Sequence, residues 1–262
     1  MANKYLARGD APLAPESWAA LDQAVIEAAK GVLAGRRLLE VEGPYGLGLK
    51  AVPLPDVEDD EGLVSGAVVP VSTVRAGFTL AKRDLAAHER DGVPLDTTPA
   101  VQAARTCARR EDELIFWGTQ AAPGLLTAAG AAEQPLAAWD APGEAAEDII
   151  RAISALDRAG FHGPYALALA PDRYNRLLRL YPRGNRTELE HLQTVVQDGV
   201  HKAPVLESGG VLLAVGRPTG AIVLGQDLSV GFIGPAGDRL EFTVSETLAL
   251  VLRQPAAVCV LK

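Results

Sequence analysis

The chain has 262 residues, of which 48% are hydrophobic and 22% charged, and its formal net charge is -8. This composition is typical of a globular protein with a substantial core, and it excludes a disordered chain or a small disulfide scaffold. The negative charge argues against nucleic acid as a partner. Because no stretch reaches the roughly 18 apolar residues of a membrane span and residues 1–18 lack a signal-peptide core, we expect a cytoplasmic protein without a membrane partner.

The first half of the chain combines two helices with extended segments. Pro15 begins an amphipathic helix, since apolar residues recur at intervals of three and four until Gly35. A short strand is expected over residues 37–42. Residues 51–80 are rich in Val and Pro and carry an acidic tip at 56–61, which predicts a long β-arm that projects from the core. Thr98 and Pro99 begin the longest helix, which we expect to reach about Ala121 and to form the spine of the fold.

The second half predicts a compact α/β lobe followed by a β-rich segment. We expect a helix over residues 144–159, a strand over 165–170, and helices over 172–181 and 187–198. From Val205 onward, turns at glycines and prolines separate strands that end at Leu261. The two cysteines, Cys107 and Cys259, lie in segments with the pattern of packed elements, so we expect buried free thiols.

No pattern of residues predicts catalysis. The four histidines lack metal-ligand spacing, and the glycines after Glu42 match neither the dinucleotide fingerprint nor the P-loop. The acidic residues Glu111, Asp112 and Glu113 are adjacent on a helix and point in different directions, so a solvated face or an inter-subunit salt bridge is expected. The sequence therefore predicts no catalytic residue, no metal site and no cofactor.

Seven phrases, in order along nearly the whole chain, resemble the encapsulin family of shell proteins, also called linocin-like proteins. They are LAPESW, AGRRLLEVEGPYG, VRAGFTL, EDELIFWG, GPYALAL, LGQDLSVGF and SETLALVL. The resemblance implies the α+β fold of tailed-phage major capsid proteins, with a peripheral domain, an extended loop and an axial domain. The expected divisions are 1–50 (N-terminal helix and peripheral domain), 51–80 (extended loop), 81–132 (peripheral spine helix), 133–222 (axial domain) and 223–262 (peripheral domain).

The resemblance also implies a function without catalysis. About sixty copies of the chain would close into an icosahedral cage, and the short length of the chain favours the smallest shell. The cage would enclose a peroxidase or a ferritin-like iron-storage enzyme through a short C-terminal targeting peptide. A prophage capsid protein is the structural alternative, and a peptidase or bacteriocin is the enzymatic one. Some relatives bind flavin through a tryptophan, but Arg83 stands at that position here, so no flavin is expected.

Two groups of site residues follow from the resemblance. The cargo-peptide site would comprise Ile26, Leu33, Arg36, Glu40, Asp227, Leu228 and Val230. The pore-lining residues would be Tyr181, Arg183 and Asn185. The alternatives are a plain core in which Arg36 pairs with Glu40, and an ordinary solvated loop. If Arg36 binds the peptide, Arg36→Ala is expected to leave shells intact and to reduce cargo loading.

Overall fold

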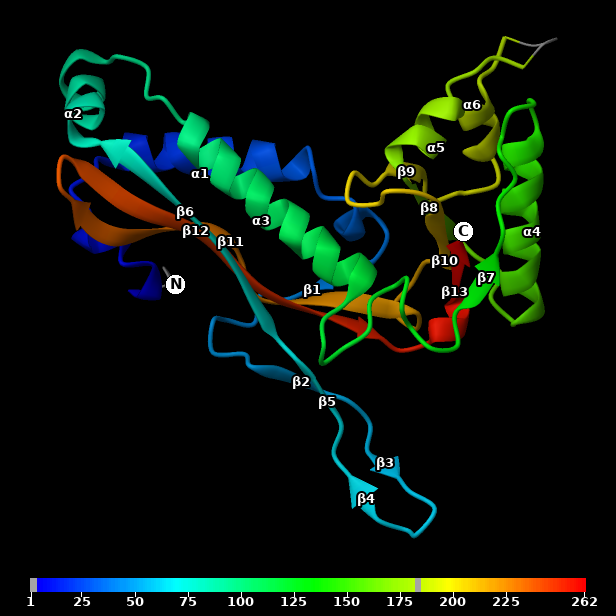
Figure 1. Cartoon of the computed structure of the whole chain (residues 1–262). Helices are drawn as coiled ribbons and strands as arrows, with labels where there is room; N and C mark the ends of the chain where they lie inside the picture. The colour runs from blue at the N-terminus through cyan, green and yellow to red at the C-terminus, as the bar shows by residue number, and fades with distance from the viewer. Residues whose placement is uncertain (1–3, 182–184) are drawn as a thin grey trace.

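The computed structural model describes residues 4–181 and 185–262 of the chain (Figure 1). The α-helices are α1 (Pro15–Lys30), α2 (Lys82–Asp91), α3 (Thr98–Trp117), α4 (Glu144–Arg158), α5 (Pro171–Arg176) and α6 (Glu188–Leu192). The strands are β1 (Glu40–Glu42), β2 (Ala51–Pro53), β3 (Val57–Glu58), β4 (Val64–Ser65), β5 (Val68–Pro70), β6 (Ser72–Ala81), β7 (Ala132–Gln134), β8 (Tyr165–Leu169), β9 (Val200–Lys202), β10 (Gly210–Ala214), β11 (Gly220–Ala236), β12 (Arg239–Leu252) and β13 (Val258–Leu261).

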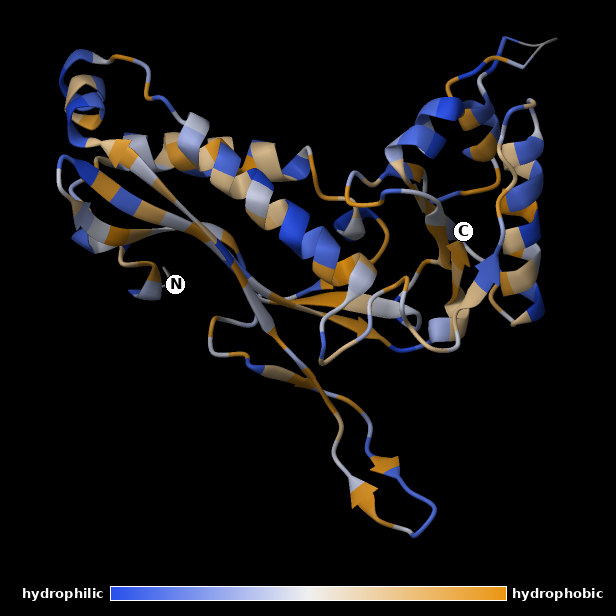
Figure 2. Cartoon of the chain, in the orientation of Figure 1, coloured by the Kyte–Doolittle hydropathy of each residue, from blue (hydrophilic) through white to orange (hydrophobic). Residues whose placement is uncertain are grey.

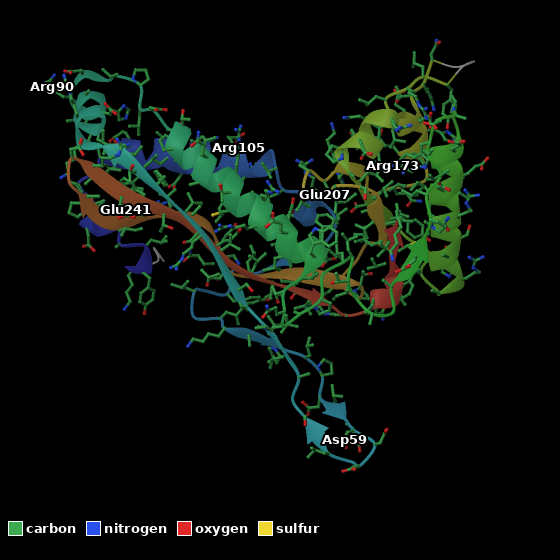
Figure 3. All side chains as sticks on the ribbon, in the orientation of Figure 1. Asp59, Arg90, Arg105, Arg173, Glu207 and Glu241 are labelled. Atoms are coloured by element: carbon green, nitrogen blue, oxygen red, sulfur yellow. The ribbon has the colours of Figure 1, made fainter. Side chains whose placement is uncertain are left out.

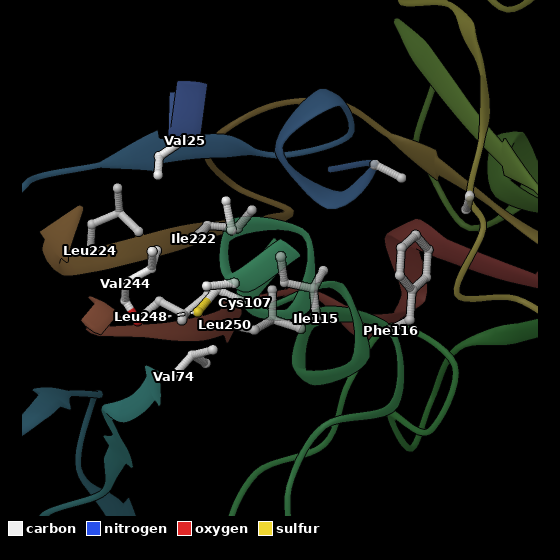
Figure 4. Packing of buried hydrophobic residues seen from close by; sticks show 14 of the residues in the cluster. Val25, Val74, Cys107, Ile115, Phe116, Ile222, Leu224, Val244, Leu248 and Leu250 are labelled. Atoms are coloured by element: carbon white, nitrogen blue, oxygen red, sulfur yellow. Dashed lines mark hydrogen bonds between the residues drawn. The ribbon is translucent and has the colours of Figure 1, made fainter. Parts of the chain in front are cut away.

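One half of the molecule is a four-stranded sheet covered by α1 and α3 (Figure 1). The strand order is β1-β11-β12-β6, with β1 parallel to β11 and the other pairs antiparallel. Helix α1 buries Leu21, Val25 and Ala29, which are spaced by four residues and therefore share one face. Figure 4 shows how Val25, Ile222 and Cys107 contribute to the apolar layer between the helices and the sheet. This layer fixes the position of α1 relative to β11.

Helix α1 ends at Lys30, five residues before the predicted end at Gly35. The chain then turns into a short 3-10 helix, η3 (Gly35–Arg37). The helix ends early because a side chain distant in the sequence holds the chain in this turn. The Asp112 carboxylate accepts hydrogen bonds from the backbone N–H groups of Ala34 and Gly35, at 2.9 Å each. Gly35 fits this turn closely, since a Cβ at this position would lie 2.6 Å from Ile115 Cδ1 and the Ile115 side chain would have to shift. The prediction of one continuous helix is wrong for these residues.

The other half is a five-stranded sheet in the order β7-β13-β10-β8-β9, flanked by α4. The predicted helix over 144–159 and strand over 165–170 are confirmed by α4 and β8, whereas α5 and α6 are shorter than predicted. Strand β13 pairs with β10 and β7, so these four residues belong to this sheet and not to the peripheral part expected for 223–262. The lobe is thus closed by the last strand of the chain.

The β-arm is shorter than predicted. Strands β2 and β5 pair, β3 and β4 form a hairpin, and this segment projects away from the rest of the molecule (Figure 1). In Figure 3, Asp59 lies at its far end. Strand β6 instead pairs with β12 along its whole length, from Ser72↔Leu248 to Ala81↔Arg239, so residues 72–81 lie in the central sheet and the arm ends before them. The hairpin carries exposed apolar residues on its strands and polar residues at its tip (Figure 2).

The cysteines and the helices bear on two further predictions. Cys107 and Cys259 are both free and buried, as predicted, and the Cys107 thiol donates a hydrogen bond to the Val244 carbonyl oxygen at 3.3 Å. Across residues 4–181 and 185–262, no helix combines the length and the apolar character that a membrane crossing requires.

Candidate functional site

A surface hollow of about 680 Å³ lies between α1 and the middle of β11. Its lining comes from residues 4 and 6–10 near the N-terminus, from Asp22, Val25 and Ile26 of α1, and from Leu228 and Ser229 of β11. The lining thus combines apolar residues with the charged residues Lys4, Arg8, Asp10 and Asp22. Concave sites of this composition suit a ligand with aliphatic anchors and few polar groups.

Ile26 and Leu228 meet at this hollow, as expected from the sequence. The Ile26 side chain is notable because the residue is 43% exposed although it is large and apolar. Leu33 and Val230 occupy different positions, since they are 8% and 0% exposed. Leu33 packs beside Leu228, and Val230 belongs to the core beneath the strand. Both side chains are buried and neither lines the hollow, so the structure does not place them at its surface with Ile26 and Leu228.

Arg36 lies at the centre of a cluster of carboxylates. Its guanidinium donates to Glu111 Oε1 at 2.7 Å and Glu111 Oε2 at 2.9 Å. It also donates to Asp227 Oδ1 at 2.8 Å and to Glu246 Oε2 at 2.9 Å. The planar guanidinium fork is suited to such multiple contacts. Arg36 therefore joins η3 to α3, β11 and β12, and the alternative in which it pairs with Glu40 is wrong.

The cluster holds more carboxylates than cations, and protonation relieves the imbalance. Burial raises the pKa of Glu246 above its ordinary value, and the neighbouring Glu111 raises it further. Glu246 Oε1 is buried and accepts no hydrogen bond from the described residues. A proton on this oxygen can be donated to the Glu111 carboxylate, which satisfies both groups. Although burial lowers the pKa of Arg36, its bonds to Glu111 and Asp227 raise it overall, so Arg36 stays charged.

The neighbouring Asp112 is buried in the same region. Burial raises its pKa to about 6, even though the N–H groups of Gly35 and Ala34 favour the charged form. Glu111 and Asp112 are 0% and 1% exposed. The expectation of a solvated acidic face is therefore wrong for both, because their partners come from residues 34–36, far away in the sequence. Only Glu113 matches it, in an exposed ion pair with Arg109.

A bulge in β11 presents Asp227 to Arg36. The register between β11 and β12 shifts on both sides of Gln226, whose N–H donates to Thr247 Oγ1 at 2.7 Å. The bulge turns Asp227 toward Arg36 and leaves Leu228 at the hollow. Glu40 is exposed in β1 and pairs in register with Ala221, so it does not join this cluster.

The predicted pore loop is only partly described. Tyr181 is half-buried, its N–H donates to the Arg186 carbonyl oxygen at 3.2 Å, and its ring meets His191 edge-on at 5.7 Å between centroids. Asn185 is exposed. Arg183 lies outside the described residues.

The residues near the N-terminus that line the hollow were not predicted from the sequence. Arg8 and Asp22 form an ion pair at its edge, and residues 4 and 6–10 line it. No periodicity marks these residues, and Arg8 contacts Asp22 and Val230, which are 14 and 222 residues away in the sequence. Among the residues that the structure describes, no group of three or more His, Cys, Asp or Glu side chains is arranged to hold a metal ion.

Comparison with known proteins connects this architecture to one family. The family model Linocin_M18, described as an encapsulating protein for peroxidase, matches residues 3–249. The chain belongs to the encapsulin shell protein family. It is 32% identical over 281 residues to the type 1 encapsulin shell protein EncA of Myxococcus xanthus (strain DK1622), covering 98% of this chain and 96% of that relative. It is also 29% identical over 268 residues to a diheme-cytochrome-encapsulin shell fusion protein of Kuenenia stuttgartiensis, covering 94% of this chain and 73% of that relative.

Solved structures give the same fold. A crystal structure of a virus-like particle from Pyrococcus furiosus is similar with a TM-score of 0.77 and 23% identity, covering 94% of this chain and all of that chain. Mycobacterium phage Bobi provides a second neighbour, with a TM-score of 0.63, 14% identity, and coverage of 88% of this chain and 90% of that chain. The fold is thus the α+β capsid fold predicted from the sequence. As a member of this family the chain is a structural shell protein and not an enzyme.

Proposed function

We propose that about sixty copies of this chain close into a cytoplasmic cage, and that the hollow between α1 and β11 binds the C-terminal targeting peptide of a cargo enzyme. The observation that carries the proposal is the exposed Ile26 beside Leu228 in a concave site. A targeting peptide with aliphatic anchors would cover both side chains and remove apolar surface from water. The cargo would be a peroxidase or a ferritin-like protein.

The family model and one relative support an association with cargo. The family model is described as an encapsulating protein for peroxidase. In the fusion relative, by its name, a diheme cytochrome and an encapsulin shell share one chain. A separate cargo chain needs a docking site in place of such a fusion. The hollow supplies one, and repetition over many subunits makes weak individual sites sufficient.

We further propose that Tyr181, Arg183 and Asn185 line a pore on a symmetry axis of the cage. The short bridge between Leu180 and Thr187 holds the two sides of this loop together, and Asn185 at its end is exposed. A ring of such polar groups would bias the passage of small ions.

The experiment uses a fluorescent protein that ends in a Gly- and Leu-rich tail from a peroxidase cargo of the family, co-expressed with the shell chain. Wild-type shells should retain it. Ile26→Asp and Leu228→Asp should form shells of normal size and lose about tenfold or more of the probe, because each removes an apolar contact worth about 1.5–3 kcal/mol.

Ile150→Asp is the matched control, because Ile150 is 48% exposed on α4 in the other half of the molecule. It should load the probe as the wild type does. Exclusion of the probe by wild-type shells, or full loading of Ile26→Asp shells, would overturn the docking proposal.

A further inference from the structure

Residues 4–10 form one side of the hollow. They comprise two short 3-10 helices, η1 (Lys4–Leu6) and η2 (Arg8–Asp10), joined at Ala7. Most of their residues line the hollow opposite α1 and β11. The segment therefore determines the width of the hollow and the groups that face a ligand from that side.

Arg8 fixes this segment to both other walls. Its Nε donates to the Val230 carbonyl oxygen of β11 at 2.8 Å, and its Nη1 donates to Asp22 Oδ2 of α1 at 2.8 Å. Its Nη2 also donates to Asp22 Oδ1. The guanidinium lies over the Trp18 ring, 4.6 Å from its centroid. A charged group with bidentate geometry and a stacking partner holds one orientation.

Two backbone features are consistent with a fixed wall. Gly231 lies directly beneath Leu6, since a Cβ at that glycine would be 3.3 Å from both Leu6 Cδ2 and the Leu6 carbonyl oxygen. Ala7 has a φ of 49°, which is the left-handed region that residues other than glycine avoid. Such a conformation persists only where surrounding contacts impose it. Leu6 on one side of Ala7 and Arg8 on the other provide those contacts.

We infer that residues 4–10 are a wall of the cargo-docking hollow, held in place by the Arg8–Asp22 ion pair, and that this wall sets which peptides the hollow accepts. The inference rests on the proposed function of the hollow. The charged residues that line the hollow are Lys4, Arg8, Asp10 and Asp22, whose formal charges sum to zero, which suits a peptide whose anchors are aliphatic. Arg8 and Asp22 are positioning residues, since their charged groups are used by each other and by Val230.

The test is a charge exchange with the same fluorescent probe. Arg8→Asp places two carboxylates together, and Asp22→Arg places two guanidinium groups together, so each should move the wall and lower loading about tenfold. The double variant Arg8→Asp/Asp22→Arg restores opposite charges and should recover loading to within about threefold of the wild type. Sedimentation and thermal unfolding verify that each variant forms shells. If the pair served only to stabilise the subunit, loading would fall only in the variants whose Tm or shell yield also falls.

The matched control is the exposed Arg109–Glu113 pair of α3, at 3.1 Å, neither of whose residues lines the hollow. Its single exchanges, Arg109→Asp and Glu113→Arg, should not change loading. Should Arg8→Asp prevent shell formation, Arg8→Gln removes the pair without repulsion, and a loss of about threefold is expected.

Unchanged loading in the single variants, or a double variant no better than the singles, overturns the inference. The Ile26→Asp variant separates this outcome from failure of the docking proposal. If Ile26→Asp excludes the probe while Arg8→Asp retains it, the hollow binds cargo and the wall does not select it. If Ile26→Asp also retains the probe, the docking proposal itself fails.

Discussion

Arg36→Ala should destabilise the subunit rather than act only on cargo loading. Arg36 bonds to Glu111 and Glu246, whose side chains are 1% and 0% exposed. Removing the cation from a buried pair leaves an uncompensated buried charge and costs about 3–5 kcal/mol. Since the stability of a domain is only about 5–15 kcal/mol, a large part of it depends on this contact. These contacts therefore predict a loss of subunit stability, whereas the sequence predicted intact shells with less cargo.

The assay is thermal unfolding of purified shells, with yield and particle size measured in parallel. A loss of about 3–5 kcal/mol corresponds to a decrease in Tm of about 6–20 °C for a chain of this size. The double variant Arg36→Ala/Glu111→Gln removes the stranded charge and should regain at least half of the loss. Arg109→Ala, in an exposed pair, should change Tm by only about 1–3 °C. A wild-type Tm for Arg36→Ala would refute the reasoning.

Two other predictions concern pH and the arm. Because burial raises the pKa of Asp112 to about 6 from 3.8, protonation favours the folded state, and this contribution is lost as pH rises from about 4 to 6. In denaturant titrations, the free energy of unfolding of Asp112→Asn relative to that of the wild type should therefore rise by about 3 kcal/mol from pH 4 to pH 7. Parallel plots of unfolding free energy against pH for the two proteins would contradict this. Deleting residues 56–61 should abolish closed particles while Tm and circular dichroism stay near wild-type values, because the exposed Val57 and Val64 of the hairpin have no core of their own. Normal particles from this deletion would show that the tip is dispensable.

Local patterns in the sequence predicted elements that bury one regular face. Helix α4 and strand β8 follow the expected boundaries closely because Ile149, Ala152 and Leu156 recur at helical spacing and residues 165–169 form an unbroken apolar run. The resemblance to encapsulins identified the fold, and it brought Ile26 and Leu228 to one site. These features depend on residues close together in the sequence or on whole phrases of the family.

Features made by distant residues could not be predicted in this way. Strand β6 has the same Val-rich extended pattern as the arm before it, and only its pairing with β12, more than 150 residues later, places it in the sheet. Arg36 has its partners 75, 191 and 210 residues away. Arg8 and Val230 are 222 residues apart. Periodicity carries no information about such pairs, which are formed when the whole chain packs.

The most direct test of the account is a cryo-electron microscopy map of shells assembled with the tailed fluorescent probe. The expected map shows closed icosahedral particles with peptide density in each hollow, in contact with Ile26 and Leu228 and bordered by residues 4–10. Particles that hold the probe with the hollow empty and the tail bound elsewhere would contradict it, as would a chain that remains a 27.5 kDa monomer.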